Sequence, residues 1–532
     1  MSDPLEFRIR PWIKAVDEKA RLAFISSLLA GIVCHLLVIV GHYPAYSGLT
    51  LFINSGTTQL AEGRWLAALI MYLNGVATLP VLVGIEMLVS YSLASTVLVK
   101  TLELKSDFLI VAFSIIFITF PVIAGRNSFL YMSDCYGMAV LFACAGANRW
   151  NKARHYKDLI ICTIYLAFSF GCYQTDLSVA LVVFAIVLFR YNLTGKPIKV
   201  ILRKAVDAIV VIVIALILYY IIFRLSLVFF SITPTSRTEM HLDFPHIFAG
   251  IRKCYSAVKW FLLYNAFYSR PVGRMIVVCT FVVSCLFAVS GILTLLKAED
   301  RWLRILFVGL IVLVMPILAC YIFIVVPIQT FQTRLFSAYV FFAELPILLC
   351  NSFVSEEANI AEVFSLKKHQ IAHCLAGLYH RGLLLLSAVS VCFFFVVSNT
   401  AYMSAYLNYE KEYSLALRIV DRIENTPGYH HGMKVGIVNS NDFDIYDGNT
   451  SNMLAEYIPM MEQYGNGIMS NVFGLRLFID QFIRTDMDII NYDFPMRELI
   501  TEAGQDVVDR MEPFPALNCT TIVDDVLYFY LT

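Results

Sequence analysis

Eleven apolar segments alternate with polar segments along the first 400 residues of this chain. Most of them approach the roughly 20 apolar residues that a helix needs to cross the ~30 Å hydrocarbon core of a bilayer. The strands of a membrane barrel alternate in polarity and are only about ten residues long, so the pattern excludes a barrel. We predict about eleven transmembrane helices, at residues 22–40, 79–99, 107–124, 133–147, 158–171, 176–190, 204–223, 275–296, 305–326, 335–350 and 382–400.

Composition supports the same class. Of the 532 residues 59% are hydrophobic and only 15% are charged, and the mean hydropathy is +0.71. A soluble chain of this length does not carry so much apolar surface. The predicted fold class is therefore mainly α, a polytopic α-helical membrane protein.

The charges of the connecting loops predict the orientation, because Lys and Arg concentrate in cytoplasmic loops. With the N-terminus in the cytoplasm, every inner loop is basic, and the short outer loops carry the isolated arginines Arg64, Arg126 and Arg334. The alternation places the C-terminal end outside. The inner-loop residues are Lys100, Lys105, Arg149, Lys152, Arg154, Lys157, Lys196, Lys199, Arg203, Lys204, Lys297, Arg301, Arg304, Lys367, Lys368 and Arg381.

The composition changes after Thr400, which predicts two domains, residues 1–400 in the membrane and 401–532 outside it. The second region has 8 Lys and Arg against 20 Asp and Glu, a net charge of −12. We predict a helix at 402–423, a buried strand at 433–438 and a hairpin at 521–531 whose turn lies near Asp524-Asp525. These elements indicate a small acidic α/β domain.

One outer loop, residues 225–274, is long and mixes basic and aromatic side chains. Long loops escape the charge rule. Such a mixture suits a segment in the headgroup layer of the membrane. The interpretations left open are an ordinary interfacial belt and a site for an anionic lipid headgroup.

The first outer loop, residues 42–65, is unusually polar for a segment between two apolar runs and ends in Glu62-Gly63-Arg64-Trp65. Ionisable groups at the lipid boundary are costly and tend to be functional. We predict that this loop helps to form an outward-facing active site at the membrane surface. Glu62 is a candidate acid, and Arg64 and Trp65 are candidate substrate-binding residues.

A second polar segment, residues 125–134, precedes the fourth predicted helix and contains Arg126, Asn127, Tyr131 and Asp134. Asp134 has two interpretations. It caps the helix, or it is a general base beside the cationic Arg126.

Further candidates lie at other outer helix ends. Tyr173 and Gln174 precede Asp176, for which a helix cap is the favoured interpretation over catalysis. Arg334 has no charged sequence neighbour. It is either an anchor that reaches the membrane surface or a phosphate ligand, for which the guanidinium geometry is suited.

Two carboxylates, Glu86 and Glu344, lie inside apolar segments. They favour an alternative function, a polytopic transporter or a flippase for a lipid-linked glycan. That alternative predicts inverted repeats with broken helices, and the sequence has no such self-similarity. Nucleotide-binding and protease motifs are absent from the sequence, and no ligand cluster calls for a metal or another cofactor.

Several short motifs together resemble those of the bacterial serotype-converting O-antigen glucosyltransferases, integral membrane enzymes similar to the GT-C glycosyltransferases. The motifs extend over most of the chain: Glu-Gly-Arg-Trp at 62–65, Cys-Tyr-Gln at 172–174, Arg334, MKVGIV at 433–438, EPFPALNC at 512–519 and VDDVLYFYL at 523–531.

This resemblance implies an enzyme of the bacterial inner membrane that takes a sugar, in this family glucose, from a polyprenyl phosphate. The acceptor would be a lipopolysaccharide O-antigen unit or another surface glycan on the periplasmic side. A flippase and a donor synthase are implied partners, and nucleic acid is not. GT-C enzymes use an acid in an early outer loop as the base, but residues 42–61 contain no Asp or Glu. The base therefore falls to Asp134, with Glu62 second. A polymerase or ligase of the cell envelope is a further alternative, separable by its product.

Overall fold

The structure is a computed structural model and describes residues 17–41, 46–50, 56–235, 238, 243–264, 270–295, 300–326, 330–353, 369–438, 469, 472–483, 485, 487–490 and 506–531. The chain forms two compact units. The first consists of residues 1–40, 54–127 and 132–399, and the second of residues 41–53, 128–131 and 400–532.

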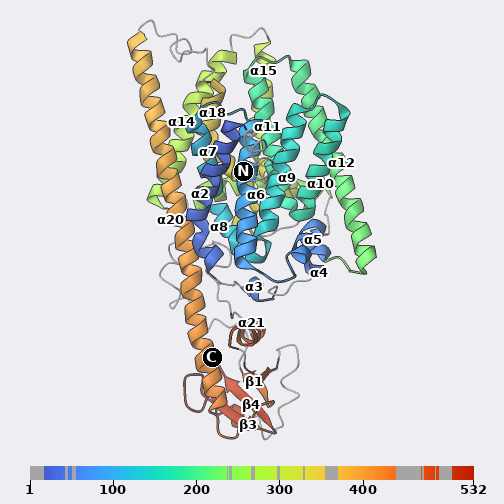
Figure 1. The fold of residues 1–532 in the computed structure, drawn as a ribbon, viewed down its shortest axis with the longest axis vertical. Coiled ribbons are helices and arrows are strands. Elements are labelled where there is room, and N and C mark those ends of the chain that lie inside the picture. Colours follow the sequence, from blue (N-terminus) through green and yellow to red (C-terminus); the bar gives the residue numbers. More distant parts are fainter. Residues whose placement is uncertain are drawn as a thin grey trace, which may run out of the picture. The chain divides into compact units, whose positions relative to one another are not determined.

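The first unit is a bundle of helices that run alternately in opposite directions (Figure 1). Its longer helices are α2 (Glu18–Val40), α6 (Pro80–Thr101), α7 (Asp107–Thr119), α9 (Ser133–Lys152), α10 (Tyr156–Cys172), α11 (Leu177–Leu193), α12 (Ile198–Phe230), α13 (Phe244–Lys259), α14 (Pro271–Leu295), α15 (Arg301–Ala319) and the first part of α20 (His369–Glu424). Shorter elements connect them: α4 (Thr57–Ala61), α5 (Trp65–Leu73), α8 (Pro121–Asn127), η2 (Gln174–Asp176), η4 (Trp260–Tyr264), α16 (Ile322–Val325), η5 (Thr333–Leu335), η6 (Ser337–Tyr339), α17 (Val340–Ala343) and α18 (Leu345–Phe353).

The polytopic, mainly α fold predicted from the sequence is confirmed. Among the described residues, eight helical segments are long and apolar enough to cross a membrane: Glu18–Val40, Pro80–Thr101, Asp107–Asn127, Leu130–Lys152, Gln174–Leu193, Ile198–Phe230, Arg301–Ala319 and Arg381–Glu424. The predicted segments at 158–171 and 275–296 appear as the helices α10 and α14.

The prediction of one continuous helix at 335–350 is wrong. This stretch is divided among η5, η6, α17 and α18. Pro346 has no N–H group to continue a helix and lies in the first turn of α18, where proline is tolerated. The stretch therefore contains several helix ends within the bundle.

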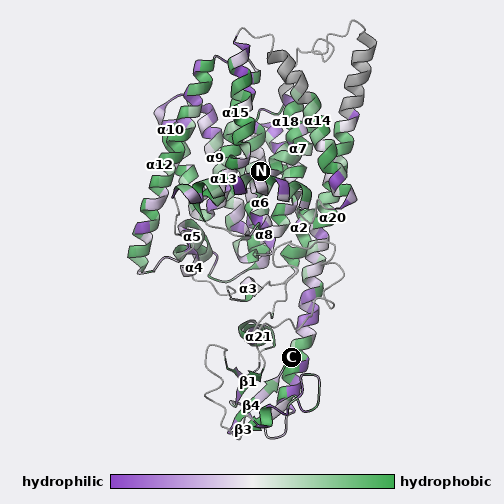
Figure 2. Ribbon diagram, turned by 180° about the vertical axis from the view of Figure 1, so that it is seen from behind, coloured by the Kyte–Doolittle hydropathy of each residue, from purple (hydrophilic) through white to green (hydrophobic). Residues whose placement is uncertain are grey.

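Hydrophobic residues make up most of α12 (Figure 2), and many of their side chains are exposed. On α12, Ile209 and Ile217 are exposed, and so are Leu306 and Val312 on α15. Exposed aliphatic side chains in this density suit contact with lipid tails rather than water.

The long loop at 225–274 contains more helix than the sequence suggested. Its helix α13 packs against α15 and α16 within the bundle, and Tyr255 donates a hydrogen bond to the carbonyl oxygen of Leu313 at 2.6 Å. Phe244 and Phe248 on the same helix remain exposed. The interfacial interpretation of this segment stays a prediction.

The helices α6 and α9 pack against each other along their length. A Cβ atom at Gly137 of α9 would lie 3.0 Å from Ser90 Cβ and 3.2 Å from the carbonyl oxygen of Met87, both in α6. Small residues permit such close approach of membrane helices. The pair holds the N-terminal ends of both helices, where Glu86 and Asp134 lie, at fixed separation.

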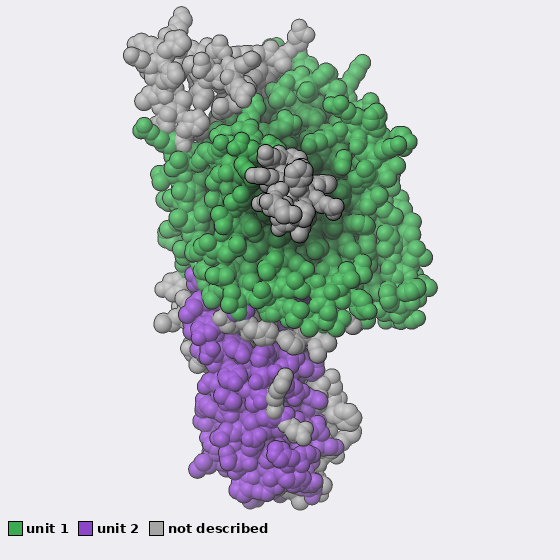
Figure 3. Space-filling view, in the orientation of Figure 1, with its two compact units in different colours: residues 1–40, 54–127, 132–399 green, residues 41–53, 128–131, 400–532 purple. Residues whose placement is uncertain are grey.

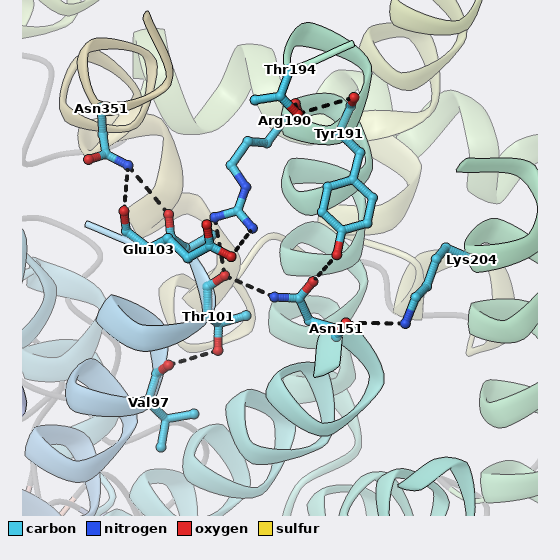
Figure 4. Close-up of polar contacts among 10 residues, drawn as sticks. Val97, Thr101, Glu103, Asn151, Arg190, Tyr191, Thr194, Lys204 and Asn351 are labelled. Atoms are coloured by element: carbon cyan, nitrogen blue, oxygen red, sulfur yellow. Dashed lines mark hydrogen bonds and ion pairs between the residues drawn. The ribbon is translucent and has the colours of Figure 1, made fainter. Parts of the chain in front are cut away.

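At the other end of these helices, basic side chains bind the backbone (Figure 4). Lys204 Nζ donates to the carbonyl oxygens of Trp150, Asn151 and Ala153 at 2.7, 3.1 and 3.2 Å, at the C-terminal end of α9; Figure 4 draws the contact with Asn151. Arg190 contacts Glu103 at 3.0 Å and the Thr101 carbonyl oxygen at 3.4 Å. Cations there satisfy carbonyl groups that have no partner within their own helix.

The second unit, which Figure 3 distinguishes by colour, contains the remainder of α20 and a small four-stranded sheet. Its strands are β1 (Lys434–Val438), β2 (Asp488–Ile489), β3 (Thr520–Val523) and β4 (Val526–Tyr530), in the order β2-β1-β4-β3. The strand β1 is parallel to β2 and β4, and β3 and β4 form an antiparallel hairpin. Three further elements are α3 (Tyr46–Thr50), α21 (Val472–Phe478) and η8 (Ile479–Ile483).

The elements predicted for this region are confirmed. The strand predicted at 433–438 is β1, and the helix predicted at 402–423 is the end of α20. Asp524 and Asp525 have φ values of 50° and 62°, the left-handed conformation of a two-residue hairpin turn in which Asp is tolerated.

Part of the first outer loop packs inside this second unit. Leu49 of α3 is 1% exposed and belongs to the apolar core that β1, β4, α20 and α21 also line. Gln481 Nε2 donates to the Leu49 carbonyl oxygen at 2.9 Å. Residues 42–45 and 51–55 of this loop lie outside the described residues, and residues 56–65 belong to the first unit.

Candidate active site

A buried ion pair joins two outer helix ends. Arg126, in the last turn of α8, donates from Nη2 to Asp176 Oδ1 at 2.6 Å and from Nη1 to Oδ2 at 3.0 Å. The side chains are 1% and 0% exposed. Two parallel N–H···O bonds fix both orientation and distance, and an ion pair without access to water needs such geometry to offset desolvation.

The protein itself occupies the other donors of Arg126. Nε donates to the Arg334 carbonyl oxygen at 3.0 Å, and Nη1 also donates to the Tyr91 hydroxyl at 3.3 Å. On the other side of the pair, Ser337 Oγ donates to Asp176 Oδ1 at 2.6 Å. These contacts make the pair the centre of a network that links α6, α8, η2, η5 and η6.

This network corrects two interpretations. Asp176 precedes α11, but its side chain makes no capping hydrogen bond, because both carboxylate oxygens bind Arg126. The hypothesis also placed Asp134 beside Arg126. In the structure Arg126 pairs with Asp176 instead, and the Asp134 carboxylate accepts hydrogen bonds from Asn74 and from the Cys135 backbone.

Asp134 lies in the first turn of α9 and is 1% exposed. Its Oδ1 accepts the backbone N–H of Cys135 at 2.7 Å, and its Oδ2 accepts from Asn74 Nδ2 at 3.0 Å. The same Asn74 nitrogen donates to Glu86 Oε2 at 2.8 Å. The helix begins one residue before Asp134, after Met132, so Asp134 is not the cap residue.

A turn at Glu62-Gly63-Arg64 forms another part of the site. Arg64 Nη1 contacts Glu62 Oε2 at 2.7 Å and donates to Gln59 Oε1 at 2.8 Å. The side chains of Arg64 and Glu62 are 19% and 10% exposed, so this pair is more accessible than Arg126 and Asp176.

Neighbouring side chains hold this turn in place. Gln174 Nε2 donates to the Glu62 carbonyl oxygen at 2.9 Å, and the Tyr219 hydroxyl donates to the Gly63 carbonyl oxygen at 2.9 Å. Gly63 has φ +82°, and a Cβ there would lie 2.6 Å from the Tyr219 hydroxyl oxygen. The turn therefore requires glycine. Tyr321 donates to the Gln174 carbonyl oxygen, which fixes Gln174 in turn.

Tyr173 connects the two guanidinium groups. The Arg64 Cζ atom lies 5.1 Å from the centroid of its ring, and the Arg126 Cζ atom 5.4 Å. Tyr136 packs edge-on against Tyr173 at 4.7 Å. Arginine is attracted to aromatic faces at these distances. Tyr173 therefore keeps the partly exposed pair, Arg64 and Glu62, at a fixed distance from the buried pair, Arg126 and Asp176.

Asp134 is connected to the Arg64 turn through α5. Asn74, at the end of this helix, donates to Asp134, and the Cys135 thiol donates to the carbonyl oxygen of Ala67 in the same helix at 4.0 Å. Within the first unit, the structure therefore connects predicted site residues from three separate outer segments: Glu62, Arg64 and Trp65, then Arg126 and Asp134, and then Tyr173 and Gln174.

The remaining predicted site residues are less central. Trp65 packs edge-on against Phe168 at 5.9 Å, and its buried Nε1 has no hydrogen-bond partner among the described residues. Asn127 is buried at the end of α8. Arg334 contributes its carbonyl oxygen to Arg126. Tyr131 belongs to the second unit, where it packs edge-on against Phe129.

Sequence reasoning missed Asn74 and assigned Glu86 to an ion path. No motif marks either residue, because Asn74 is 60 residues from Asp134 and only the packing of α6 on α9 brings them together. Tyr91 and Ser337 lie in apolar segments and gave no signal. Glu344 is fully buried between α17 and α18, and neither of its carboxyl oxygens has a hydrogen-bond partner within the described part of the chain.

Metal ligands do not cluster here. Within the described ranges, no group of three or more His, Cys, Asp and Glu side chains is placed to hold a metal ion. The donors of the site are guanidinium, amide and hydroxyl groups, which suit an anionic, polar substrate.

A membrane bundle with carboxylates and guanidinium groups gathered at one end has the features of an integral membrane enzyme for such a substrate. Comparison with known families identifies which one. The family model described as glucosyl transferase GtrII matches residues 28–350, and the chain belongs to this family. It is a glycosyltransferase, and the family implies glucosyl transfer in O-antigen modification.

The family assignment confirms the resemblance inferred from short motifs, although the match ends before the motifs at 433–438, 512–519 and 523–531. Comparison with curated proteins and with solved structures finds no match.

Proposed function

We propose that this protein transfers glucose from a polyprenyl phosphate to a hydroxyl group of an O-antigen or another surface glycan, on the outer side of the bacterial inner membrane. The sugar C1–O bond to the phosphate breaks, and the electron pair leaves with the polyprenyl phosphate. A new bond forms between C1 and the acceptor oxygen, whose proton passes to a general base.

Asp134 is the proposed base. One observation carries this assignment: the helix α5 begins directly after the partly exposed cation Arg64 and ends at Asn74, which donates to Asp134, and the Cys135 thiol contacts the carbonyl oxygen of Ala67 in the same helix. A carboxylate that accepts a proton and a cation that neutralises a leaving phosphate must act on opposite sides of one sugar carbon. Glu62 is less suitable, because its carboxylate contacts Arg64 directly.

Arg64 is a better phosphate ligand than Arg126. The Arg126 guanidinium is 1% exposed and is held by Asp176, Tyr91 and Arg334. A phosphate that bound there would have to displace a bidentate carboxylate. The Arg64 side chain is 19% exposed, its contacts with Glu62 and Gln59 come from Nη1, and the Tyr173 ring lies 5.1 Å from its Cζ atom.

Trp65 is the proposed contact for the sugar. Its indole N–H is buried without a partner among the described residues, and an unsatisfied donor of this kind favours a ligand hydroxyl.

The outward orientation rests on loop charges and on the second unit. Leu49, in the first loop, packs in the core of the unit that contains residues 400–532. The first loop and the acidic C-terminal region must therefore lie on the same side of the membrane. Because basic loops occupy the opposite side, we assign this side to the periplasm.

The test uses purified full-length protein in liposomes, with polyprenyl-phosphate [14C]glucose as donor and O-antigen lipopolysaccharide as acceptor. We expect labelled acceptor, and we expect Arg64→Ala to lower kcat/KM by about 10–100-fold through loss of a charge-assisted contact. Arg224→Ala is the matched control, because Arg224 is exposed on α12.

If labelled donor crosses the bilayer but no label reaches any glycan, the proposal is wrong and the flippase alternative is supported. If glucose is incorporated from a nucleotide sugar and not from the lipid-linked donor, the donor assignment is wrong.

A further inference from the structure

One amide nitrogen binds two carboxylates at the N-terminal ends of α6 and α9. Asn74 Nδ2 lies 2.8 Å from Glu86 Oε2 and 3.0 Å from Asp134 Oδ2. An amide NH2 group has two hydrogens, and here each is donated to a different acid. Both oxygens of Asp134 thereby have a fixed donor, since Oδ1 accepts from the Cys135 backbone.

The side chain of Asn74 is not needed for the local fold. Asn74 ends α5, and it does so through its backbone N–H, which donates to the carbonyl oxygen of Ile70 at 2.9 Å. The side chain instead extends to two other helices. Its φ of −77° is one that any residue adopts, so backbone conformation does not explain asparagine at this position.

The three residues differ in exposure in an informative way. Asp134 is 1% exposed, whereas Asn74 and Glu86 are half-buried. Buried carboxylates need hydrogen-bond donors or an opposite charge, and Asp134 receives two hydrogen bonds. A second acid held beside it adds like charge, which is unfavourable for folding alone. An arrangement that costs stability in this way is more often found where it serves chemistry.

We propose that Asn74 and Glu86 are positioning residues for Asp134 in the transfer reaction. The inference rests on the proposed function, since it requires Asp134 to be the base. Asn74 fixes the rotation of the Asp134 carboxylate so that its remaining lone pairs face the acceptor hydroxyl. Glu86 anchors the amide from the other side and prevents it from turning away.

The substitutions have distinct expected effects. Asn74→Ala removes both hydrogen bonds and lowers kcat by about 10–100-fold, the range expected when a reacting group is misplaced by roughly 1 Å, while KM for the lipid-linked donor stays unchanged. Glu86→Ala has a similar effect. Glu86→Gln keeps an acceptor for the amide and recovers most of the rate, with a residual loss below about tenfold because a neutral acceptor is weaker.

The deciding experiment is a double-mutant cycle of Asn74→Ala with Asp134→Asn, measured as glucose transferred per folded protein in liposomes. If Asn74 acts through Asp134, then Asn74→Ala has little further effect in the Asp134→Asn background. Asn425→Ala is the matched control, because Asn425 also donates to a carboxylate, Asp421 at 2.9 Å, but lies at the end of α20 in the second unit.

Several results would overturn the inference. Losses that multiply in the double variant, or a raised KM with unchanged kcat, would contradict it alone and leave the proposed function standing. Wild-type activity in Asp134→Asn would remove the base and the inference together. Failure of the unmodified protein to use the lipid-linked donor would contradict the proposed function first, and the inference with it.

Discussion

The two ends of the membrane bundle differ in how their cations are paired. At the end with Lys204 and Arg190, cations bind backbone carbonyl oxygens at the C-terminal ends of helices, and the carboxylates that join them, Glu103 at Arg190 and Asp300 at Arg304, are 67% and 41% exposed. At the end with Arg64 and Arg126, cations bind side-chain carboxylates that are only 10% and 0% exposed. The two sets are about 20 Å or more apart along the helix axes, since helices rise 1.5 Å per residue.

Helix direction explains part of this difference. The N-terminal end of a helix carries partial positive charge and the C-terminal end partial negative charge. Asp134 lies in the first turn of α9 and Asp176 directly before α11, whereas Glu86 lies in the second turn of α6, and Lys204 binds a C-terminal end. At the carbonyl end, the donors of Lys204 bind backbone carbonyl oxygens that need a partner in the folded protein in any case.

The carboxylates at the other end are not explained by the fold in the same way. Asp134 and Glu86 share a single amide donor, and Arg64 and Glu62 remain partly exposed. We therefore propose that the carbonyl-bound end stabilises the bundle and that the end with the buried carboxylates carries the chemistry.

Substitution of the proposed base should give the largest difference in transfer rate between variants at the two ends. Asp134→Asn is expected to lower the rate of glucose transfer by about 10²–10⁴-fold, the usual contribution of general base catalysis. The matched control is Asp158→Asn, an aspartate in the first turn of α10 at the opposite end. The measurement is the initial rate of glucose transfer per folded protein. Equal losses of rate in both variants would contradict the assignment of the chemistry to the end with Asp134.

Breaking the buried pair should mainly reduce stability. Asp176→Ala leaves the Arg126 charge buried without its bidentate partner, and we expect a loss of about 3–5 kcal/mol in the free energy of unfolding. Denaturant unfolding in detergent measures it. The double variant Arg126→Met with Asp176→Leu should regain part of that loss. No recovery in the double variant would contradict the view that the unpaired charge is the cause.

At the end with Lys204, a substitution should lower the free energy of unfolding by less and leave the transfer rate unchanged. Lys204→Met retains the apolar stem but loses the donors to three carbonyl oxygens. We expect a loss of about 1–3 kcal/mol in the free energy of unfolding. Transfer per folded molecule should be unchanged. A fall in that rate, with donor binding impaired, would show that this end takes part in the reaction.

The exposed pair of His430 and Asp525 in the second unit should have the smallest effect on stability. Hydrogen bonds to the His431 carbonyl oxygen and to Asp525 raise the pKa of His430. A raised pKa stabilises the fold below the pKa of the unfolded chain, about 6.5, and this contribution disappears as pH rises through the folded value. Hydrogen exchange in the β3–β4 hairpin should therefore be slightly slower at pH 5.5 relative to His430→Gln. The two proteins should agree at pH 8.5, and a difference only at high pH would contradict the assignment.

Much of the fold could be predicted because single segments carry the signal. An apolar run of about 20 residues predicts a membrane helix wherever it packs, and the Asp524-Asp525 turn is encoded by its own two residues. The stretch at 335–350 failed because apolar composition does not show where helices end. Pro346 was visible, but the contact of Ser337 with Asp176, 161 positions apart, was not.

Motifs in the sequence indicate candidate site residues but not the partners of those residues. Glu62 and Arg64 are an exception, because they lie two positions apart in one motif and their contact is local. Arg126 and Asp176 are 50 residues apart on different elements, so each was interpreted alone. Helices of similar apolar character do not specify their neighbours through periodicity, and the partners of Asp134 therefore appear only in the packed structure.

The most direct test asks which end binds the donor. A polyprenyl-phosphate glucose analogue with a photoreactive group on the isoprene unit nearest the phosphate is cross-linked to the full-length protein in liposomes, and the labelled peptides are identified by mass spectrometry. The account predicts labels within residues 57–74 and 172–176, around Arg64 and Tyr173. Labels within residues 101–105 and 190–204 instead would contradict it.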